Sequence, residues 1–276
     1  FDLSATTPID SQVAEFMHNL QKETYGNPSS VHREGQAARA VIEKSRRELA
    51  TVLCCSPEEI IFTSSGSESN NMVLKGTLNS GDHFITSSYE HPAILKTLPY
   101  LKEKGLEFSL IKPDKNGRVQ PESVEEKIQT NTRLISIMHV NNELGTINPI
   151  SKIARISREK GILFHSDAVQ ALGKIPLDLG NIPADFISMS AHKLYGPKGV
   201  GALFIRKGAT LKPLIYGGGQ EHSLRASTEN IAGIGGFGMA VELAAMNLEE
   251  NSQHITRLET HLLSQLDEKN IDYKIN

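Results

Sequence analysis

Short apolar runs recur along the chain and alternate with longer stretches whose apolar residues return at helical spacing. A strand that is covered on both faces has no solvent side, so it reads as a continuous apolar run. Runs of this kind therefore predict buried β-strands. They lie at 59–63, 83–88, 107–111, 133–140, 162–167, 185–190 and 201–206.

Helix signals occupy most of the gaps between these runs. Residues 30–53 repeat apolar side chains at helical spacing. Pro121, followed by acidic residues, is typical of a helix start. Another helix is expected between Ser151, as its N-cap, and Gly161. The alternation of strands and helices predicts an α/β fold, with a mostly parallel seven-stranded sheet and helices on both faces.

Polar residues gather where several predicted strands end, which is where ligands bind in such sheets. The first cluster is "FTSSGSESNN" (62–71), in which small hydroxyl residues and Gly66 follow a strand and a helix is expected near Glu68. Backbone N–H groups at such a helix start, with a Ser hydroxyl, can cradle a phosphate. The same residue types also cap helices, so the cluster alone favours a capped turn without a ligand.

Two further strand ends carry a carboxylate and a lysine. Asp167, in "FHSDAVQ", is placed to hold a protonated ring nitrogen or to cap the following helix. Lys193, in "SMSAHKLYGPKGVG", is either an ordinary surface lysine or a desolvated amine that forms a Schiff base with a carbonyl. A phosphate cradle, a carboxylate and an imine-forming lysine are together the set that pyridoxal phosphate needs.

Two more strand ends fit the same cofactor. His91, in "SSYEHPAI", is placed to stack on a ring face, or to begin a helix. Asn142 and Glu143, in "MHVNNELGTI", are placed to contact the hydroxyl side of the ring. Each signal is weak alone, and their recurrence at successive strand ends is what favours a cofactor site.

Composition narrows the class of protein. Hydrophobic residues make up 38% and charged residues 22%, as in globular proteins. A net charge of −3 gives no general attraction to nucleic acid or to a membrane surface. No apolar run approaches the ~20 residues of a membrane span, and residues 1–10 do not read as a signal peptide. Because Cys54 and Cys55 are adjacent, no disulfide framework is expected, and we predict a cytoplasmic protein.

An ordered set of motifs resembles one known family. "SATTP", "YGNPSSVHREG", "FTSSGSESNN", "EHPA", "HVNNELGTI", "HSDAVQ", "SAHKLYGPKGVG" and "GGGQEHSLRASTEN" follow one another between Phe1 and about Asn230. In this order they look like the NifS/IscS-type cysteine desulfurases, a group within the class-V aminotransferases and the fold-type I pyridoxal phosphate enzymes. The ordered set is far more specific than any one motif.

The resemblance implies a role for each matching residue. Lys193 would carry the cofactor as an imine and move a proton, and His91 would stack on the ring and serve in acid–base steps. Asp167 would keep the ring nitrogen protonated, with Gln170 and Asn142 near the ring's phenolic oxygen. Gly66, Ser67, Ser190 and His192 would bind the phosphate, and Thr228 would reach the phosphate of the other subunit.

The implied protein is an obligate homodimer with shared active sites. It would remove sulfur from L-cysteine to give L-alanine and a persulfide on an enzyme cysteine. The sulfur would then go to an acceptor or scaffold protein in iron–sulfur cluster or thiocofactor assembly.

Two local departures from the family pattern affect the phosphate end. Ser65 and Gly66 stand where the family usually has Gly and Ala, and Ser67 takes the place of a phosphate-binding Thr while keeping its hydroxyl. Ser227 replaces the glycine of the family's Arg-x-Gly-Thr, which predicts a strained loop wherever that position needs a positive φ.

The C-terminal part of the chain departs more. Residues 240–269 read as one long amphipathic helix, and 271–276 as the start of a strand. We therefore expect an N-terminal arm (1–12), a large cofactor-binding domain (13–250) and the start of a truncated small domain (251–276). The family's small domain carries the persulfide cysteine loop and a substrate-gripping arginine, which this sequence lacks. Cofactor binding is thus predicted, and turnover by this chain is left open.

Alternative functions stay open at this point. A selenocysteine lyase or another class-V lyase would use the same scaffold. A non-catalytic module that dimerises and binds a sulfur-transfer partner would need none of the cofactor residues, and the presence of Asp167, Gln170 and Lys193 argues against it. Cys54 and Cys55 match no persulfide motif, and we expect one to be packed and the other partly exposed.

Overall fold

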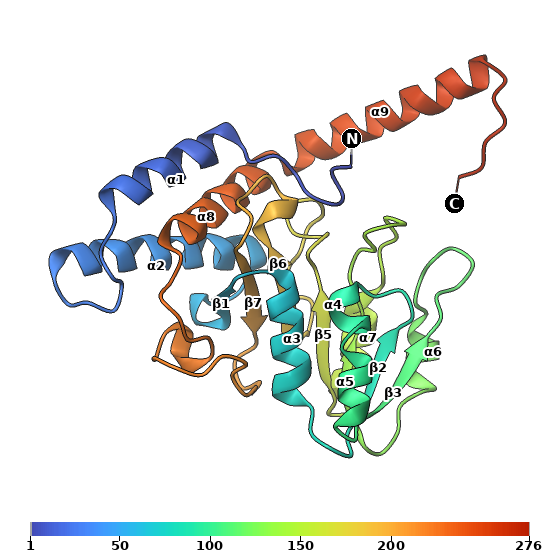
Figure 1. The fold of residues 1–276 in the computed structure, drawn as a ribbon. Coiled ribbons are helices and arrows are strands. Elements are labelled where there is room, and N and C mark those ends of the chain that lie inside the picture. The colour runs from blue at the N-terminus through green and yellow to red at the C-terminus, as the bar shows by residue number, and fades with distance from the viewer. Residues whose placement is uncertain (1, 276) are drawn as a thin grey trace.

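The computed structural model describes residues 2–275. Within that range seven strands form one sheet in the order β1-β7-β6-β5-β4-β2-β3 (Figure 1). β7 runs antiparallel to both of its neighbours, and the other pairs are parallel, so the predicted mostly parallel sheet is confirmed. The strands are β1 (Ile60–Thr63), β2 (His83–Ser87), β3 (Glu107–Ile111), β4 (Thr132–Ser136), β5 (Leu163–Asp167), β6 (Phe186–Ser190) and β7 (Gly201–Ile205).

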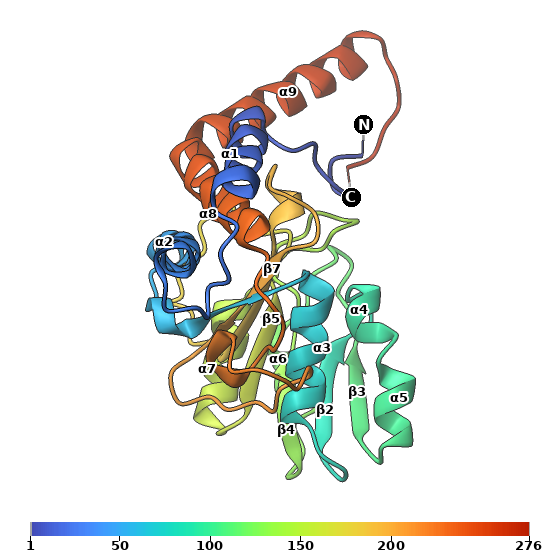
Figure 2. The ribbon, with the colours of Figure 1, turned by 60° about the vertical axis from the view of Figure 1, so that its left-hand side comes forward.

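Alternate strand residues enter two apolar cores, one on each face of the sheet. Ile60 and Phe62 join the larger core, whereas Ile61 between them joins the smaller one, as the two-residue period of a strand requires. Helices on both faces supply the opposite walls (Figure 2). The smaller core is covered by α3 (Gly66–Thr77), α4 (Pro92–Leu95) and α5 (Leu98–Glu103), and the larger by α1 (Ser11–Glu23), α2 (Arg33–Leu53), α6 (Pro121–Glu125), α7 (Ile150–Glu159) and α8 (Ile231–Met246).

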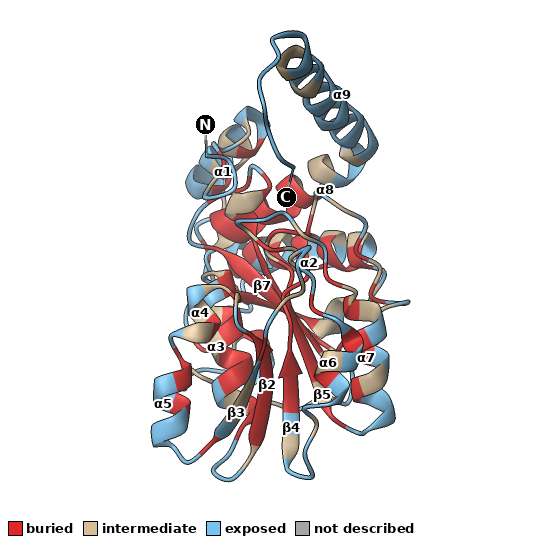
Figure 3. Cartoon of the chain, turned by 90° about the vertical axis from the view of Figure 1, so that its right-hand side faces the viewer, coloured by how far each residue is buried: buried red, intermediate tan, exposed pale blue. Residues whose placement is uncertain are grey.

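The prediction of one helix over 240–269 is wrong. The segment belongs to two helices, α8 and α9 (Leu248–Glu268), which are bent by 64°. The break lies at Asn247, which has a non-helical φ of −101°. Its backbone N–H and its side-chain amide both donate to the Leu243 carbonyl, at 3.1 and 3.0 Å, and close the last turn of α8. α8 is buried in the body, whereas α9 leaves it and is exposed along its length (Figure 3).

Two smaller expectations also need correction. Residues 271–275 form no strand, because no other strand lies beside them in the part of the chain that the structure describes; residue 276 lies outside that part. α7 begins at Ile150 with Pro149 as its N-cap, so Ser151 lies inside the helix, while Gly161 has the positive φ of 68° expected just after a helix end. The division of the chain at residue 250 stays a prediction.

No single helix among residues 2–275 has the length and apolar composition to cross a bilayer. Within that range, only α8 and α9 taken together, as a bent pair, are long and apolar enough.

A buried ion pair fastens the loop before α8 to the body. Arg46 of α2 donates from Nη1 and Nη2 to the Glu221 carboxylate at 2.9 and 2.7 Å, and the Phe62 N–H donates to the same carboxylate at 2.6 Å. Both charged side chains are buried. Glu221, His222 and Ser223 all have positive φ, a conformation that costs free energy for residues other than glycine. The ion pair therefore holds a strained turn against the edge of the sheet.

Replacing one partner of this pair should make the protein much less stable to unfolding. We expect Glu221→Ala to lower the free energy of unfolding by about 3 kcal/mol, because it leaves the buried Arg46 charge with only the partly exposed Glu43 carboxylate, 3.5 Å from Nε, as an ionic partner. Urea unfolding followed by circular dichroism measures the change.

The matched control is Lys160→Ala. Lys160 pairs with Glu125 at 3.6 Å, and both side chains are half exposed, so its removal should cost less than about 1 kcal/mol. An equal effect of the two substitutions would contradict the role given to the buried pair.

Ser227 has a φ of 137°, so the strain expected from its replacement of a glycine is present. We expect Ser227→Gly to raise the free energy of unfolding by about 1 kcal/mol, because glycine adopts this backbone without the clash of a Cβ. The control is Ser80→Gly in an exposed turn outside the positive-φ region, which should be neutral or destabilising. A Ser227→Gly protein that is less stable than wild type in urea would refute the strain.

Candidate active site

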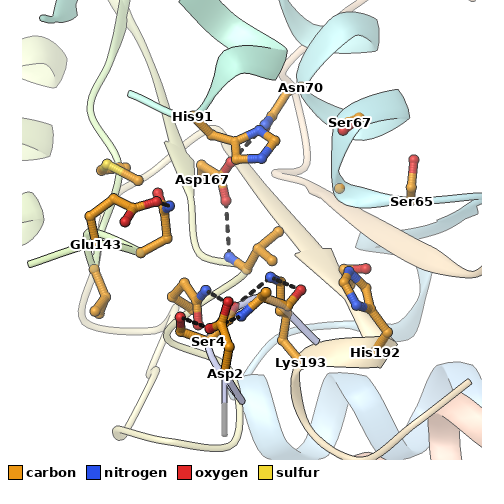
Figure 4. Close-up of a pocket in the computed structure, with 18 residues that line it drawn as sticks. Asp2, Ser4, Ser65, Ser67, Asn70, His91, Glu143, Asp167, His192 and Lys193 are labelled. Carbon is orange, nitrogen blue, oxygen red and sulfur yellow. Dashed lines mark hydrogen bonds between the residues drawn. The ribbon is translucent and has the colours of Figure 1, made fainter. Parts of the chain in front are cut away.

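A cavity of about 440 Å³ opens where β5 and β6 end and α3 begins (Figure 4). Its size falls in the range of roughly 300–1,000 Å³ that is usual for small-molecule sites. Every predicted site residue except Thr228 lines this cavity. Glu143 lines it as well. The predicted residues in its lining are Gly66, Ser67, His91, Asn142, Asp167, Gln170, Ser190, His192 and Lys193.

Asp167, the last residue of β5, is the most buried charged group in the lining, with 5% of its surface exposed. Its Oδ2 accepts from Asn70 Nδ2 at 2.6 Å, and its Oδ1 accepts from the Val169 N–H at 3.0 Å. Burial raises the pKa of Asp167, while these two hydrogen bonds and the charges of His91 and Lys193 act to lower it. No helix follows directly, so the N-cap reading of Asp167 is wrong.

Lys193 follows β6 in the short helical turn Ala191–Lys193 and points into the cavity (Figure 4). Its amine donates to the backbone carbonyls of Ser4 and Ala5, each at 2.6 Å. Desolvation lowers the pKa of Lys193, although Asp2 and Asp167 raise it. Lys193 is therefore not a free surface lysine, and its amine becomes neutral more readily than an ordinary one.

The start of α3 forms the opposite wall of the cavity. The helix begins at Gly66, two residues earlier than expected, and the Ser65 hydroxyl caps it by accepting from the Glu68 N–H at 3.1 Å. Because Ser65 serves as the cap, Ser67 is available to the cavity that it lines. A Cβ at Gly66 would lie 2.5 Å from Val169 Cγ2, so a larger residue here would require the Val169 side chain to move.

His91 combines both readings of its sequence position. It is the N-cap of α4, with Nδ1 accepting from the Ala93 N–H at 3.1 Å, and it also lines the cavity. Because Nδ1 accepts a hydrogen bond, the neutral ring carries its proton on Nε2. Figure 4 shows the ring next to the Asp167 carboxylate.

Two contributors to the site are absent from the residues predicted above. Asn70 lies within the 62–71 motif, and its position four residues after Gly66, on the same helix face, indicates a side chain that points toward the same site. The N-terminal arm reaches across the cavity, where Gln170 Nε2 donates to the Ser4 carbonyl at 2.8 Å and His192 Nδ1 lies 3.1 Å from Thr6 Oγ1. These contacts join residues more than 150 positions apart, which no local pattern predicts.

Thr228 and the two cysteines lie elsewhere. Thr228 is exposed and lines a smaller cavity of about 150 Å³ together with Ser64 and Arg225. Cys54 is exposed at the end of α2, and Cys55 is half-buried against the larger core, as predicted. Neither cysteine lines the main cavity.

The two cysteines should differ sharply in reactivity. Burial raises the pKa of the Cys55 thiol to about 12, so almost none of it is the reactive thiolate at pH 8. We expect iodoacetamide at pH 8 to label Cys54 at least tenfold faster than Cys55, as peptide mass spectrometry would measure. In urea the two rates should converge. Equal rates in the native protein would show that Cys55 is not packed.

Comparison with known proteins gives a consistent assignment. The family model described as aminotransferase class-V matches residues 1–274. Cysteine desulfurase IscS of Dictyoglomus turgidum is 44% identical over an alignment of 279 residues, which covers all of this chain and 71% of that protein. Cysteine desulfurase IscS of Methanosarcina thermophila is also 44% identical, and the alignment covers 96% of this chain and 67% of that protein.

Solved structures agree with the sequence relatives. A NifS-like protein superposes with a TM-score of 0.94 at 43% identity, over 97% of this chain and 75% of that one. SspA, solved in complex with cysteine, superposes with a TM-score of 0.84 at 42% identity, over 88% of this chain and 72% of that one. The chain therefore belongs to the class-V aminotransferase family and, within it, to the NifS/IscS-type cysteine desulfurases, a group of pyridoxal phosphate-dependent enzymes.

Proposed function

We propose that this protein removes sulfur from L-cysteine with bound pyridoxal phosphate. In the proposed reaction L-cysteine and an enzyme thiol give L-alanine and an enzyme persulfide, whose sulfur then goes to an acceptor or scaffold protein in iron–sulfur cluster or thiocofactor assembly. The observation that carries the proposal is the placement of the Asp167 carboxyl group and the Lys193 amine in one cavity. Relatives named cysteine desulfurase, and a neighbour solved with cysteine, support the choice of substrate.

The residues present fit pyridoxal phosphate. A ring nitrogen needs a buried carboxyl partner, and Asp167 is buried with hydrogen bonds from Asn70 and Val169 that stabilise its charge. The phosphate needs N–H and hydroxyl donors, which the start of α3 supplies; Ser67, Ser190 and His192 would hold it together with the backbone at Gly66. An aldehyde carbon needs a lysine whose pKa is lowered, as that of Lys193 is.

When bound, the cofactor supplies an electron sink for the carbon next to the substrate amine. Asp167 would accept a hydrogen bond from the ring nitrogen and so favour its protonated form. Lys193 would be the covalent attachment point and, once freed, would move the proton at the substrate carbon. That role requires its amine to leave the carbonyls of Ser4 and Ala5, which hold it in this structure.

Three further side chains would orient the reacting groups. His91, with its proton on Nε2, would stack on the ring and hold a proton for the leaving sulfur. Gln170 and Asn142 would hydrogen-bond the phenolic oxygen of the ring. Neither Cys54 nor Cys55 lines the cavity, so neither is proposed as the sulfur-accepting thiol.

We also propose that the protein is cytoplasmic and forms a homodimer. Thr228 lies outside the cavity of its own chain, in an exposed position. That placement supports the proposal that it reaches the phosphate held by a second copy.

The attachment point can be tested against a rival lysine. Lys174 lies nearby, with its amine on the Gln170 side chain, and desolvation lowers its pKa to about 8. We expect the protein mixed with pyridoxal phosphate to develop a visible absorption band that borohydride removes, with the label mapped to Lys193 by mass spectrometry. Lys193→Ala should abolish the band.

Lys174→Ala is the matched control and should keep the band. A label on Lys174, or an unchanged band in Lys193→Ala, would refute the assignment of Lys193. A protein that never develops the band with excess cofactor would refute the proposed function itself.

A further inference from the structure

A second buried carboxyl group lies directly behind the site. Glu90 precedes His91 in the turn between β2 and α4 and is 3% exposed. It does not line the cavity, so the proposed chemistry leaves it without a role. Its Oε1 accepts from the Ser87 hydroxyl at 2.5 Å and from the Met138 N–H at 2.9 Å.

These two hydrogen bonds join two walls of the cavity. Ser87 ends β2, and Met138, which lines the cavity, follows the neighbouring strand β4. The same two segments are tied once more, because Asn141 Nδ2 donates to the Tyr89 carbonyl at 3.1 Å. Glu90 thus fixes the turn that carries His91 against the segment after β4, which also lines the cavity.

The surroundings of Glu90 favour its neutral form. Its Oε2 is buried and has no hydrogen-bond partner among residues 2–275. The pKa of Glu90 is raised from 4.5 to about 8, chiefly by burial and to a lesser extent by the nearby Asp167 charge, against the lowering effect of its bonds to Ser87 and Met138. The titratable groups around it are Asp167 on β5 and Tyr89 and His91 on its own turn.

We propose that Glu90 is a positioning residue. Its neutral side chain ties the His91 turn to Met138 and thereby sets the place of the His91 ring at the cavity. The consequence for catalysis rests on the proposed function, whereas the placement of the ring does not.

Two variants separate the parts of this proposal. Glu90→Gln keeps an oxygen that accepts from Ser87 and Met138 and cannot ionise. Glu90→Leu has a similar volume but leaves the buried Met138 N–H without an acceptor. Thermal unfolding shows which variants fold.

The first measurement uses cofactor-free protein. Histidine side-chain NMR, with the His91 signals assigned from a His91→Gln protein, reports the place of the ring. We expect the His91 signals of Glu90→Gln at pH 7 to match wild type and those of Glu90→Leu to shift. Unchanged signals in a folded Glu90→Leu, or a Glu90→Gln spectrum that resembles Glu90→Leu, would overturn the proposal.

A titration keeps the test decisive where Glu90→Leu does not fold. Lys174 also titrates near pH 8, so the titration uses a Lys174→Ala background. There, raising the pH from 7 to 9 ionises Glu90 and should shift the His91 signals, whereas the same protein with Glu90→Gln should lack that transition. The same titration in both proteins would overturn the proposal. The free energy of unfolding should change over the same range. Between pH 4.5 and about 8 the folded state holds a proton that the unfolded state has lost, so wild type becomes less stable as the pH rises. Glu90→Gln should lack this contribution to the pH dependence of stability.

The second measurement uses pyridoxal phosphate. We expect Glu90→Gln to bind it within about twofold of wild type and Glu90→Leu about tenfold more weakly, the effect of one lost buried hydrogen bond. A wild-type protein that binds no cofactor would count against the proposed function, while the NMR result would still decide the role of Glu90.

Discussion

A carboxyl group buried at the end of a strand must find its hydrogen-bond donors inside the protein, and at Asp167 this requirement shapes the surroundings of the cavity. Leaving such a group unpaired would lower the stability of the folded protein by roughly several kcal/mol. Asn70 on α3 and the backbone at Val169 meet the requirement. The Asn70 contact needs α3 to start close to the strand end, and there Gly66 lies beside the Val169 side chain. The helix start that would cradle a phosphate is therefore positioned by the same contacts that stabilise the carboxylate.

Two loops, the turn that carries His91 at the cavity and the turn at 221–223 outside its lining, are held by buried polar groups rather than by apolar packing alone. Glu90 ties the His91 turn to the segment after β4, and the pair of Arg46 and Glu221 holds the strained turn before α8. Buried polar contacts of this kind fix one geometry, because any other arrangement leaves a polar group without a partner. A reacting side chain carried by such a loop is therefore held in one position.

The sequence predicts the sheet well and the fine contacts poorly, for physical reasons. Buried strands read as continuous apolar runs, so all the expected strands appear near their expected positions. Strand ends share one edge of the sheet, so Asp167 and Lys193 could be expected to meet. Glu90 and Asn70 escaped notice because their partners are set by tertiary packing. The break at Asn247 escaped as well, since the helical pattern continues across it and only the cap shows where α8 ends.

In the proposed function, Asp167 holds a protonated ring nitrogen beside Lys193. ¹⁵N NMR of pyridoxal phosphate labelled at its ring nitrogen and bound to the protein would detect that proton. We expect a protonated nitrogen in wild type, with the proton lost in Asp167→Ala. An unprotonated nitrogen in wild type, or the same protonated signal in both proteins, would contradict it.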